Sequence, residues 1–304
     1  MPISTTLPHP KLSVVFSSPH PSQYLHALPW SPRSISYRPP PPRPRCYLLA
    51  SLHRARDHNG TLLLRNEDID PHRSKPAYLE ATLEDLAWLG IEWQPPLISQ
   101  SQRTDLYHSA FHRLLQQGDI YPCHCSRKDL ALMMHAPHED ENDEPVYDGH
   151  CRPTHAAPSL IEDQASNYRF RVSDGETITF TDLNHGPQSF TAGKDFGDFL
   201  IWRGDNLPSY QLACVVDDAD TQITEVVRGA DLLKSTARQI LLQRALNLPQ
   251  PSYFHTHLLR DEHGLRLAKR HDALAIRTLR AQGLTPSQVL SLATQSMTSV
   301  TSNS

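Results

Sequence analysis

The stretch Asp198–Gln239, which reads DFLIWRGDNLPSYQLACVVDDADTQITEVVRGADLLKSTARQ, decides the fold expected for this chain. Within it, LACVV (212–216) and ITEVV (223–227) are apolar runs rich in β-branched residues, which predicts two buried strands joined by the acidic turn 217–222. Ser235 is placed to cap a following helix. That helix would turn four apolar residues inward: Ala237, Ile240, Leu241 and Leu242.

Arg228 follows the second of these runs directly. Ligands of open α/β sheets bind at the carboxyl ends of the strands, so an arginine there is well placed to hold an anionic group. The alternative for a lone arginine is a simple pair with a surface carboxylate. The sequence around Arg228 has to decide between these two interpretations.

Composition narrows the class of protein. The 304 residues are 38% hydrophobic and can bury a sizeable core, and no run approaches the roughly 18 apolar residues of a membrane span. We therefore expect a soluble protein without membrane partners. A net charge of -4 confines any RNA contact to local patches. Five cysteines in a chain this long indicate a reducing compartment, which we take to be the cytoplasm.

The first 46 residues differ from the rest in composition. Twelve of the 26 prolines precede Cys46 and no acidic residue precedes Asp57, while the segment has neither helical nor strand periodicity. This composition predicts a disordered or polyproline II tail. A basic, acid-free segment is also compatible with an organelle transit peptide, although a convincing amphipathic helix is lacking.

Alternating helices and strands follow. We expect a helix from Tyr47 to Gly60, the strand TLLLR (61–65), and helices within 77–93 and 100–117, the last stopped by Gly118. Glu67 lies in the acidic cluster after the strand. A carboxylate there suits an ammonium ligand, and the alternative is a helix-capping acid cluster. Short strands are expected in 167–172, 177–183 and 188–192, and Thr285 or Ser287 starts a last helix.

Three cysteines, Cys123, Cys125 and Cys151, have spacings that suggest a metal site. Zinc in structural sites takes about four soft or borderline ligands in a tetrahedron, and two cysteines around a tight turn supply half of them. The fourth ligand has to be a tyrosine, a histidine or water. His124 and His150 are competitors, although each neighbours a cysteine and is expected to point away from the site.

Two strings identify a resemblance that covers Tyr47 to about Ala293. Y-x-L-A-x-V-V-D-D at 210–218 and V-R-G-x-D-L at 227–232 closely resemble the amino-acid pocket of class I glutamyl-tRNA synthetases. The resemblance implies an α/β fold: a Rossmann-type parallel sheet with an inserted zinc-bearing α+β region and a short helical C-terminal region. The segments expected are 1–46 (aberrant or disordered), 47–120 and 195–250 (the two catalytic halves), 121–194 (the insertion) and 251–304 (a mobile loop and helices).

The same resemblance assigns roles to individual residues. Asn66–Asp70 resembles the family's R-I-E-D-I-D, so Glu67 would meet the α-ammonium of glutamate, with Tyr210 and Arg228 holding the rest. The segment 266–270, RLAKR, stands where the family carries K-M-S-K-S. Lys269 would therefore be catalytic and ATP-binding, because its charge stabilises the phosphates as negative charge redistributes. An isolated basic string of this kind would otherwise be a solvated turn.

The cysteine pattern resembles one branch of that family. C-x-C…Y-x-G-x-C-R is similar to the zinc motif of glutamyl-Q tRNA(Asp) synthetases, which implies Cys123, Cys125, Tyr147 and Cys151 as the ligands. The chain also ends soon after the mobile loop, without room for an anticodon-binding domain. These features imply a monomer that uses L-glutamate, ATP, Mg²⁺ and Zn²⁺, and passes the glutamyl group to queuosine in the anticodon of tRNA(Asp).

One family motif, P-S-P-T-G-x-L-H-x-G-H, is missing before Tyr47. Back-translation of Arg33–Arg45 (RSISYRPPPPRPR), read one nucleotide later, permits APSPTGHLHLGHA at the family's usual distance from Glu67. We interpret this as a frame error or local frameshift, with a divergent tail as the alternative. Two other functions stay open: a truncated glutamyl-tRNA synthetase-like protein, and a non-catalytic tRNA- or glutamate-binding relative.

Overall fold

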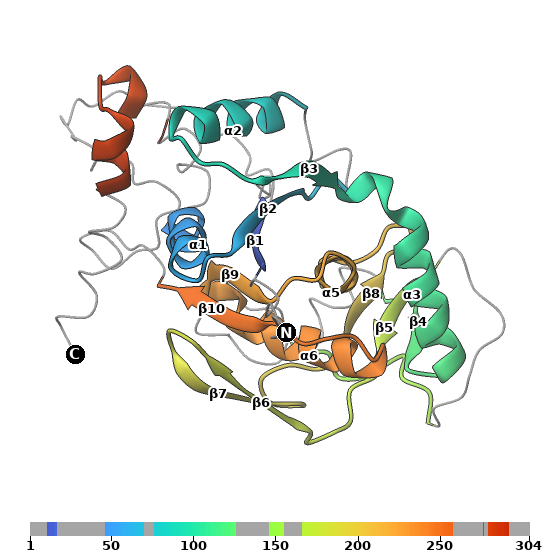
Figure 1. The fold of residues 1–304 in the computed structure, drawn as a ribbon. Helices are drawn as coiled ribbons and strands as arrows, with labels where there is room; N and C mark the ends of the chain where they lie inside the picture. Colours follow the sequence, from blue (N-terminus) through green and yellow to red (C-terminus); the bar gives the residue numbers. More distant parts are fainter. Residues whose placement is uncertain are drawn as a thin grey trace, which may run out of the picture.

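The computed structural model describes residues 11–16, 46–69, 76–125, 146–154, 166–257, 276 and 279–291, with the backbone alone at 11–16, 46–49 and 76–78. Two sheets organise these residues (Figure 1). The larger has the strand order β3-β2-β1-β9-β10-β6-β7, and the smaller has the order β4-β5-β8. Among the described residues, none of the helices combines the length and apolar character needed to cross a bilayer.

The larger sheet is parallel over five of its strands: β1 (Lys11–Phe16), β2 (Thr61–Asn66), β3 (Gln94–Ser99), β9 (Glu225–Gly229) and β10 (Ser252–Thr256). The hairpin of β6 (Thr177–Asp182) and β7 (Gly186–Thr191) extends it, because Asp182 pairs in parallel with Tyr253. We expected this hairpin to belong with the cysteine-bearing insertion, and it instead joins the main sheet.

Alternate residues of the strands face two separate cores, as the period of two in a strand requires. Leu62 and Leu64 of β2 pack with α1 (Cys46–Asp57), whereas Leu63 packs toward α3 (Thr104–Gln117). Val226 and Val227 of β9 divide in the same way. The sheet is thus covered on both faces. Helices α1 and α2 (Pro76–Trp88) lie on one side, and α3, α5 (Tyr210–Asp220) and α6 (Leu233–Ala245) lie on the other.

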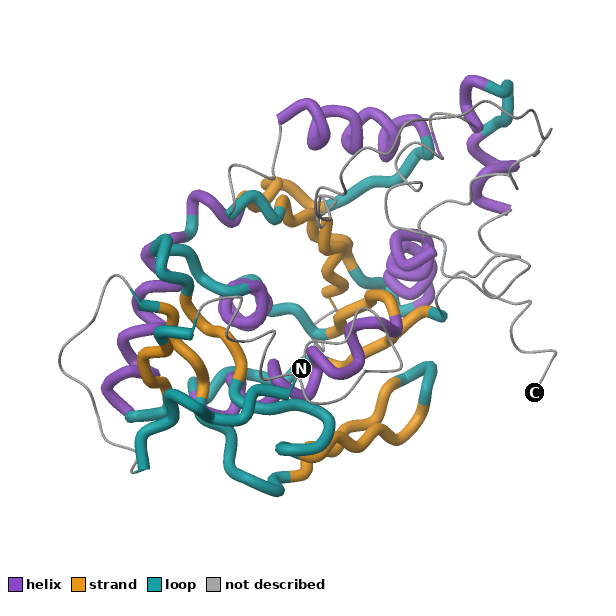
Figure 2. Tube along the Cα trace, turned by 180° about the vertical axis from the view of Figure 1, so that it is seen from behind, coloured by secondary structure: helices purple, strands orange, loops and turns teal. Residues whose placement is uncertain are grey.

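The smaller sheet is antiparallel and stands beside α3, as the view from behind shows (Figure 2). It contains β4 (Ile120–Cys123), β5 (Asn167–Phe170) and β8 (Phe199–Trp202). Gly118 ends α3 in the left-handed conformation (φ 78°), which places β4 directly after it and confirms the predicted stop. Cys123 therefore lies at the end of β4, an edge strand of this sheet.

Three sequence-based predictions within Asp198–Gln239 need correction. LACVV is part of helix α5 (Tyr210–Asp220), not a strand, and the acids 217–220 complete that helix instead of forming a turn. An apolar run of five residues has no period that separates a buried helix from a buried strand. Ser235 does not cap α6 (Leu233–Ala245), which begins two residues earlier; its hydroxyl accepts a hydrogen bond from Gln211.

The prediction for the first 46 residues is wrong at Lys11–Phe16, which form β1 at the middle of the sheet. β1 pairs with β2 from Lys11↔Thr61 to Phe16↔Asn66 and also with β9. Both partner strands lie far from this segment in the sequence, so its composition does not reveal that it pairs with them. The segment 33–45 lies outside the described residues.

Other predictions are confirmed. The helix after Cys46, the strand 61–65 and the strand before Arg228 are present as α1, β2 and β9, and Arg228 lies inside β9 near its end. The four apolar residues assigned to the inner side of α6 are buried: Ala237, Ile240, Leu241 and Leu242. Thr285 precedes a helix at 286–291 and accepts a hydrogen bond from the backbone N–H of Gln288 (3.3 Å).

Candidate active site

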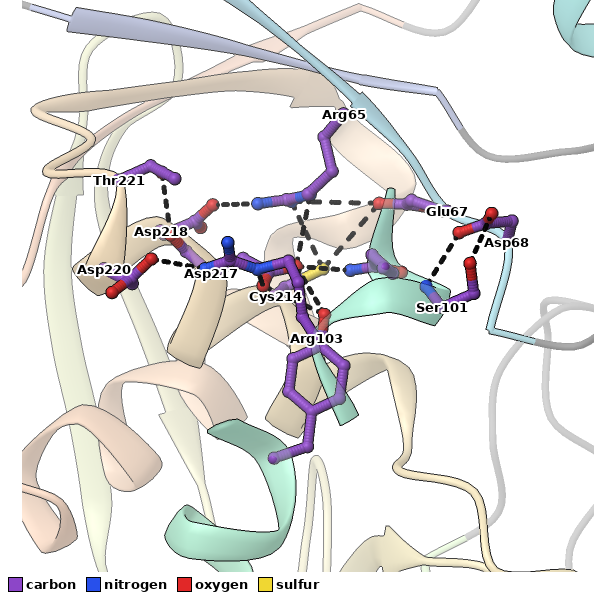
Figure 3. Close-up of polar contacts among 12 residues, drawn as sticks. Arg65, Glu67, Asp68, Ser101, Arg103, Cys214, Asp217, Asp218, Asp220 and Thr221 are labelled. Carbon is purple, nitrogen blue, oxygen red and sulfur yellow. Dashed lines mark hydrogen bonds and ion pairs between the residues drawn. The ribbon is translucent and has the colours of Figure 1, made fainter. Parts of the chain in front are cut away.

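A buried network of charged side chains lies where β2 ends against helix α5 (Figure 3). Arg65, the last buried residue of β2, donates from Nη1 to Asp218 Oδ1 at 2.5 Å. Its Nη2 lies 3.8 Å from Glu67 Oε1 and 3.6 Å from Cys214 Sγ. Moving a charged side chain from water into the protein interior is costly unless an opposite charge pairs with it. Arg65 thus links the end of β2, close to Glu67, to helix α5.

Asp217, the neighbour of Asp218, points to a different set of partners. Its carboxylate accepts hydrogen bonds from Gln100 Nε2 (2.7 Å), Arg103 Nε (2.7 Å) and the Tyr107 hydroxyl (2.9 Å). These partners lie in the 3-10 turn Gln100–Gln102 and at the start of α3. The adjacent acids of α5 therefore tie the helix to β2 on one side and to α3 on the other.

Glu67 presents a carboxylate whose charge is weakly stabilised. Its side chain is only 8% exposed. Burial raises the pKa of Glu67 to about 7, although the charge of Arg65 opposes this shift. Cys214 Sγ lies 3.8 Å from Glu67 Oε1. A cationic group that enters beside Glu67 would stabilise the ionised form, so the site is suited to an ammonium ligand.

Tyr210, the first residue of α5, responds to charges from both ends of this pocket. Burial and then the Cys214 thiol raise the pKa of the Tyr210 hydroxyl well above its ordinary value. Arg228 opposes that shift and Glu67 adds to it. The fold thus brings together the three residues that the sequence predicted for a glutamate pocket. Glu67 directly follows β2, Tyr210 begins α5, and Arg228 lies in β9.

Arg228 is 5% exposed and is held by two neighbours. Its Nε donates to His255 Nε2 at 3.1 Å, and its Nη2 donates to Thr236 Oγ1 at 2.6 Å. Among the described residues neither partner is a carboxylate, and the burial of Arg228 argues against the simple surface ion pair considered as the alternative. A buried guanidinium with neutral hydrogen-bond partners is left with a charge that an anionic ligand can balance.

The cysteines and the tyrosine predicted as metal ligands are also close together. The sulfur atoms of Cys123, Cys125 and Cys151 all lie within 4.8 Å of one another, with Cys125 and Cys151 3.5 Å apart. The Tyr147 hydroxyl lies 3.6 Å from Cys123 Sγ and 3.5 Å from Cys125 Sγ. A zinc ion with bonds of about 2.3 Å spaces its sulfur ligands roughly 3.8 Å apart. The spacing and the donor set fit zinc.

The two histidines near these ligands lie elsewhere. His124 Nδ1 contacts Ser166 Oγ at 3.0 Å, and His150 is exposed. Arg169 instead completes the surroundings of the cluster, with its Nε 3.2 Å from Cys123 Sγ and its guanidinium 3.9 Å from the Tyr147 ring centre. Its charge would favour thiolate ligands. Burial meanwhile raises the pKa of Cys125 to about 11, so metal binding has to displace that proton.

Gly197 and Asp198 seat the cysteine-bearing loop. A Cβ on Gly197 would lie 2.7 Å from the carbonyl oxygen of Tyr147, so only glycine allows this approach. The buried Asp198 carboxylate accepts from Arg152 Nη2 (2.6 Å), from the backbone N–H of Val172 (2.8 Å) and from the Tyr121 hydroxyl. Asp198 thereby connects the loop after Cys151 to the smaller sheet.

Several residues of the site were not predicted: Arg65, Asp182, Gly197, Asp198, Arg169 and His255. Arg65 carried one available signal, a charge that ends an otherwise apolar strand. The remaining contacts join residues far apart in the sequence, which local patterns do not report. Lys269 and the rest of 266–270 lie outside the described residues, so their predicted role stays a prediction.

Comparisons with known proteins agree with this fold. The sequence profile of the family described as tRNA synthetases class I (E and Q), catalytic domain, matches residues 47–303. The glutamyl-Q tRNA(Asp) synthetase of Symbiobacterium thermophilum is 44% identical over 257 residues, 81% of this chain and 79% of the relative. That of Rhodopirellula baltica is 41% identical over 252 residues, 80% of this chain and 76% of the relative.

A solved structure, the glutamate-tRNA synthetase of Elizabethkingia anophelis, superposes with a TM-score of 0.63 at 26% identity. The match covers 77% of this chain and 52% of that structure, so the chain spans about half the length of that enzyme. The chain belongs to the class I glutamyl-tRNA synthetase-like family, within the group of the glutamyl-Q tRNA(Asp) synthetases.

Proposed function

We propose that this chain activates L-glutamate with ATP and transfers the glutamyl group to queuosine in the anticodon of tRNA(Asp). The observation that carries the proposal is that a buried carboxylate, Glu67, and a buried arginine, Arg228, shift the pKa of Tyr210 in opposite directions. Glutamate carries an ammonium and two carboxylates, so it matches both charges. The names of the 41–44% identical relatives supply the acceptor.

The reaction has two steps. The α-carboxylate of glutamate attacks the α-phosphorus of ATP, which forms glutamyl-adenylate and releases pyrophosphate. A hydroxyl group of queuosine then attacks the acyl carbon, which forms an ester and releases AMP. Mg²⁺ bound to ATP would neutralise phosphate charge in the first step. Glu67 would hold the α-ammonium, and Arg228 with Tyr210 would hold the distal carboxylate, so that the α-carboxylate faces ATP.

Lys269 would provide the positive charge that the first step requires. Negative charge moves toward the leaving pyrophosphate during adenylation, and a lysine on a mobile loop stabilises it there. This assignment is based on the resemblance of 266–270 to the family loop.

We also propose a structural zinc ion with the ligands Cys123, Cys125, Tyr147 and Cys151. The surroundings of this cluster, Arg169, Gly197 and Asp198, serve to position the loop. A site with four protein ligands leaves no open position for a substrate. The zinc would therefore hold the loop in shape and take no part in the reaction.

The product linkage tests the proposed function. The chain that carries APSPTGHLHLGHA at 33–45, the motif read in the shifted frame, is incubated with Mg²⁺, ATP and labelled glutamate. The acceptor is tRNA(Asp) that carries queuosine or the same tRNA that carries guanosine at that position. We expect label only on the queuosine-containing tRNA, and the same labelling when that tRNA is prepared without its 3′-terminal adenosine. Label on both tRNAs, lost when that adenosine is absent, would instead identify a truncated glutamyl-tRNA synthetase.

A further inference from the structure

Arg228 ends a hydrogen-bonded series of three buried side chains that also includes His255 and Asp182. His255 and Asp182 are 0% and 1% exposed, and neither belongs to the predicted pocket. Asp182 Oδ2 lies 2.6 Å from His255 Nδ1, and Arg228 Nε donates to His255 Nε2 at 3.1 Å. Asp182 comes from the β6–β7 hairpin, His255 from β10 and Arg228 from β9, so three neighbouring strands of the sheet contribute one residue each.

The hydrogen-bond donor on Arg228 requires one particular tautomer of the His255 imidazole. A guanidinium Nε–H can only donate, so His255 Nε2 has to be the unprotonated acceptor. The proton of the neutral ring is then on Nδ1, where it is donated to Asp182. A protonated imidazolium would place a second N–H against Arg228. Burial lowers the pKa of His255 to about 4, against the effect of the bond to Asp182, which is consistent with a neutral ring.

Asp182 is itself held as an ionised acceptor. Burial alone would raise its pKa, but the hydrogen bond from His255 and those from the backbone N–H groups of His185 and Asn184 lower it. Those two backbone bonds to Oδ1 are 2.8 and 3.0 Å long. The backbone N–H of His255 also donates to Oδ2, at 3.1 Å. The carboxylate therefore fixes both the position of the ring and the nitrogen that carries its proton.

These contacts determine how the Arg228 guanidinium is oriented. The group is planar, and two of its three nitrogens are held: Nε by His255 and Nη2 by Thr236. Two fixed points in a rigid plane also fix the direction of Nη1. Among the described residues no protein partner of Nη1 is found, so this nitrogen is available to a ligand. Donors that are already ordered bind a carboxylate without a further loss of side-chain conformational entropy.

We propose that His255 and Asp182 are positioning residues that orient Arg228 for a carboxylate ligand, and so set the preference for glutamate over the uncharged glutamine. This proposal rests on the proposed function, because the ligand is the glutamate of that pocket. His255 does not touch the ligand. It acts through Arg228 by supplying a neutral hydrogen-bond acceptor. An apolar side chain at this position would leave the guanidinium without that bond, and a cationic side chain would repel it.

Two substitutions of His255 separate this role from simple packing. His255→Asn keeps an amide near the position of Nδ1, within reach of Asp182, and removes the acceptor for Arg228. His255→Gln extends an amide oxygen to about the position of Nε2, which retains that acceptor. His150→Asn, at an exposed histidine of the cysteine-bearing loop, is the matched control. Thermal unfolding confirms that each full-length variant is folded.

Glutamate and glutamine are titrated into each protein by calorimetry. We expect His255→Asn to weaken glutamate binding about tenfold or more, the usual effect of a lost bond to a charged group, with little change for glutamine. His255→Gln should stay within about threefold of the unchanged chain. Equal glutamate affinity in His255→Asn, or an equal loss in both variants, would overturn the proposal.

A second measurement does not depend on glutamate. In ¹⁵N spectra of histidine-labelled full chain, the His255 signal, assigned by its loss in His255→Gln, should show a protonated Nδ1 and a bare Nε2 at neutral pH. A proton on Nε2 would refute the proposed series. If the unchanged chain binds no glutamate, the proposed function is wrong, while this spectrum still decides whether His255 is the acceptor of Arg228.

Discussion

Glu67 is held close to the midpoint of its titration at neutral pH, because burial raises its pKa to about 7. Only the ionised carboxylate attracts an ammonium group, so glutamate binding should strengthen as the pH rises through 7. With a single group of pKa near 7, the affinity should increase roughly tenfold between about pH 6 and 8. Calorimetric titration of glutamate at several pH values measures this dependence.

Glu67→Gln is the control for that dependence. Its amide has no charge to lose, so binding should be weak and nearly flat over the same range. A flat profile in the unchanged chain would show that Glu67 does not meet the ammonium. An equally steep profile in Glu67→Gln would assign the titration to another group.

Arg228 supplies the opposite charge, and its removal should affect glutamate binding far more than folding. Arg228→Ala leaves the carboxylate of a bound glutamate unpaired, which typically costs about 2–5 kcal/mol. Arg244→Ala removes an arginine of α6 whose side chain is 55% exposed, and it should change neither property. Glutamate titration and urea unfolding of both variants make the comparison. Unchanged glutamate affinity in Arg228→Ala would limit Arg228 to a structural role.

Gly197 is a position where one added carbon should disturb the metal site. The Cβ of Gly197→Ala would meet the carbonyl oxygen and the amide nitrogen of Tyr147 at 2.7 and 3.0 Å, and neither backbone atom can rotate away. We expect about one zinc ion per unchanged chain and clearly less in the variant. Gly193→Asn is the control, because Gly193 has open space and a φ of 83° that asparagine tolerates.

Metal analysis of the purified proteins decides that prediction in two ways. Folded, unchanged protein with almost no zinc would reject the proposed metal site. Full zinc content in Gly197→Ala would retain the site but show that the loop can shift to admit a methyl group.

Helix α5 is the element on which the site depends, because Tyr210, Cys214, Asp217 and Asp218 all lie on it. Ser209 caps this helix, and its hydroxyl accepts a hydrogen bond from the backbone N–H of Leu212 at 3.3 Å. Ser209→Ala should lower the free energy of unfolding by about 1 kcal/mol, within the usual range of about 0.5–2 for such caps. Ser209→Asp, which keeps an acceptor, should lose much less in urea unfolding. Equal stability of all three proteins would contradict a capping role.

At the scale of the whole molecule, the segment before Tyr47 determines whether the chain can bind the ATP phosphates. Pro40–Pro44 stand where the family motif places a glycine and histidines around the ATP phosphates. Proline has no backbone N–H and a fixed φ, so it cannot form such a phosphate cradle. Loss of preorganised donors typically costs about 10²–10³ in rate for each donor. The chain as written should therefore be nearly inactive in glutamate-dependent ATP–pyrophosphate exchange.

A second protein tests the reason for that defect. Replacement of RSISYRPPPPRPR by APSPTGHLHLGHA at 33–45 should restore the exchange. Sequencing of the gene and its transcript across these codons checks the frame independently. Strong exchange by the chain as written would refute both the defect and the interpretation of this segment.

Much of the fold and of the site followed from the sequence alone. Gly118 stops a helix because it adopts the left-handed conformation without a steric penalty, and TLLLR forms a strand because its apolar residues suit both faces of a sheet. The cysteine spacing predicted a cluster that the fold does assemble. Short motifs also predicted a glutamate site at Glu67, Tyr210 and Arg228, which stays a prediction.

Tertiary structure decided what local patterns leave open. LACVV is helical, and a short apolar run that is buried throughout has no periodicity that reveals this conformation. Lys11–Phe16 is a central strand because it pairs with β2 and β9, which lie far from it in the sequence. Asp182 and His255 are 73 residues apart in sequence, and only the pairing of β6 with β10 brings their side chains to 2.6 Å. Sequence determined which residue types were available, whereas the packing of strands and helices determined which of them meet, since contacts between distant segments depend on the whole fold.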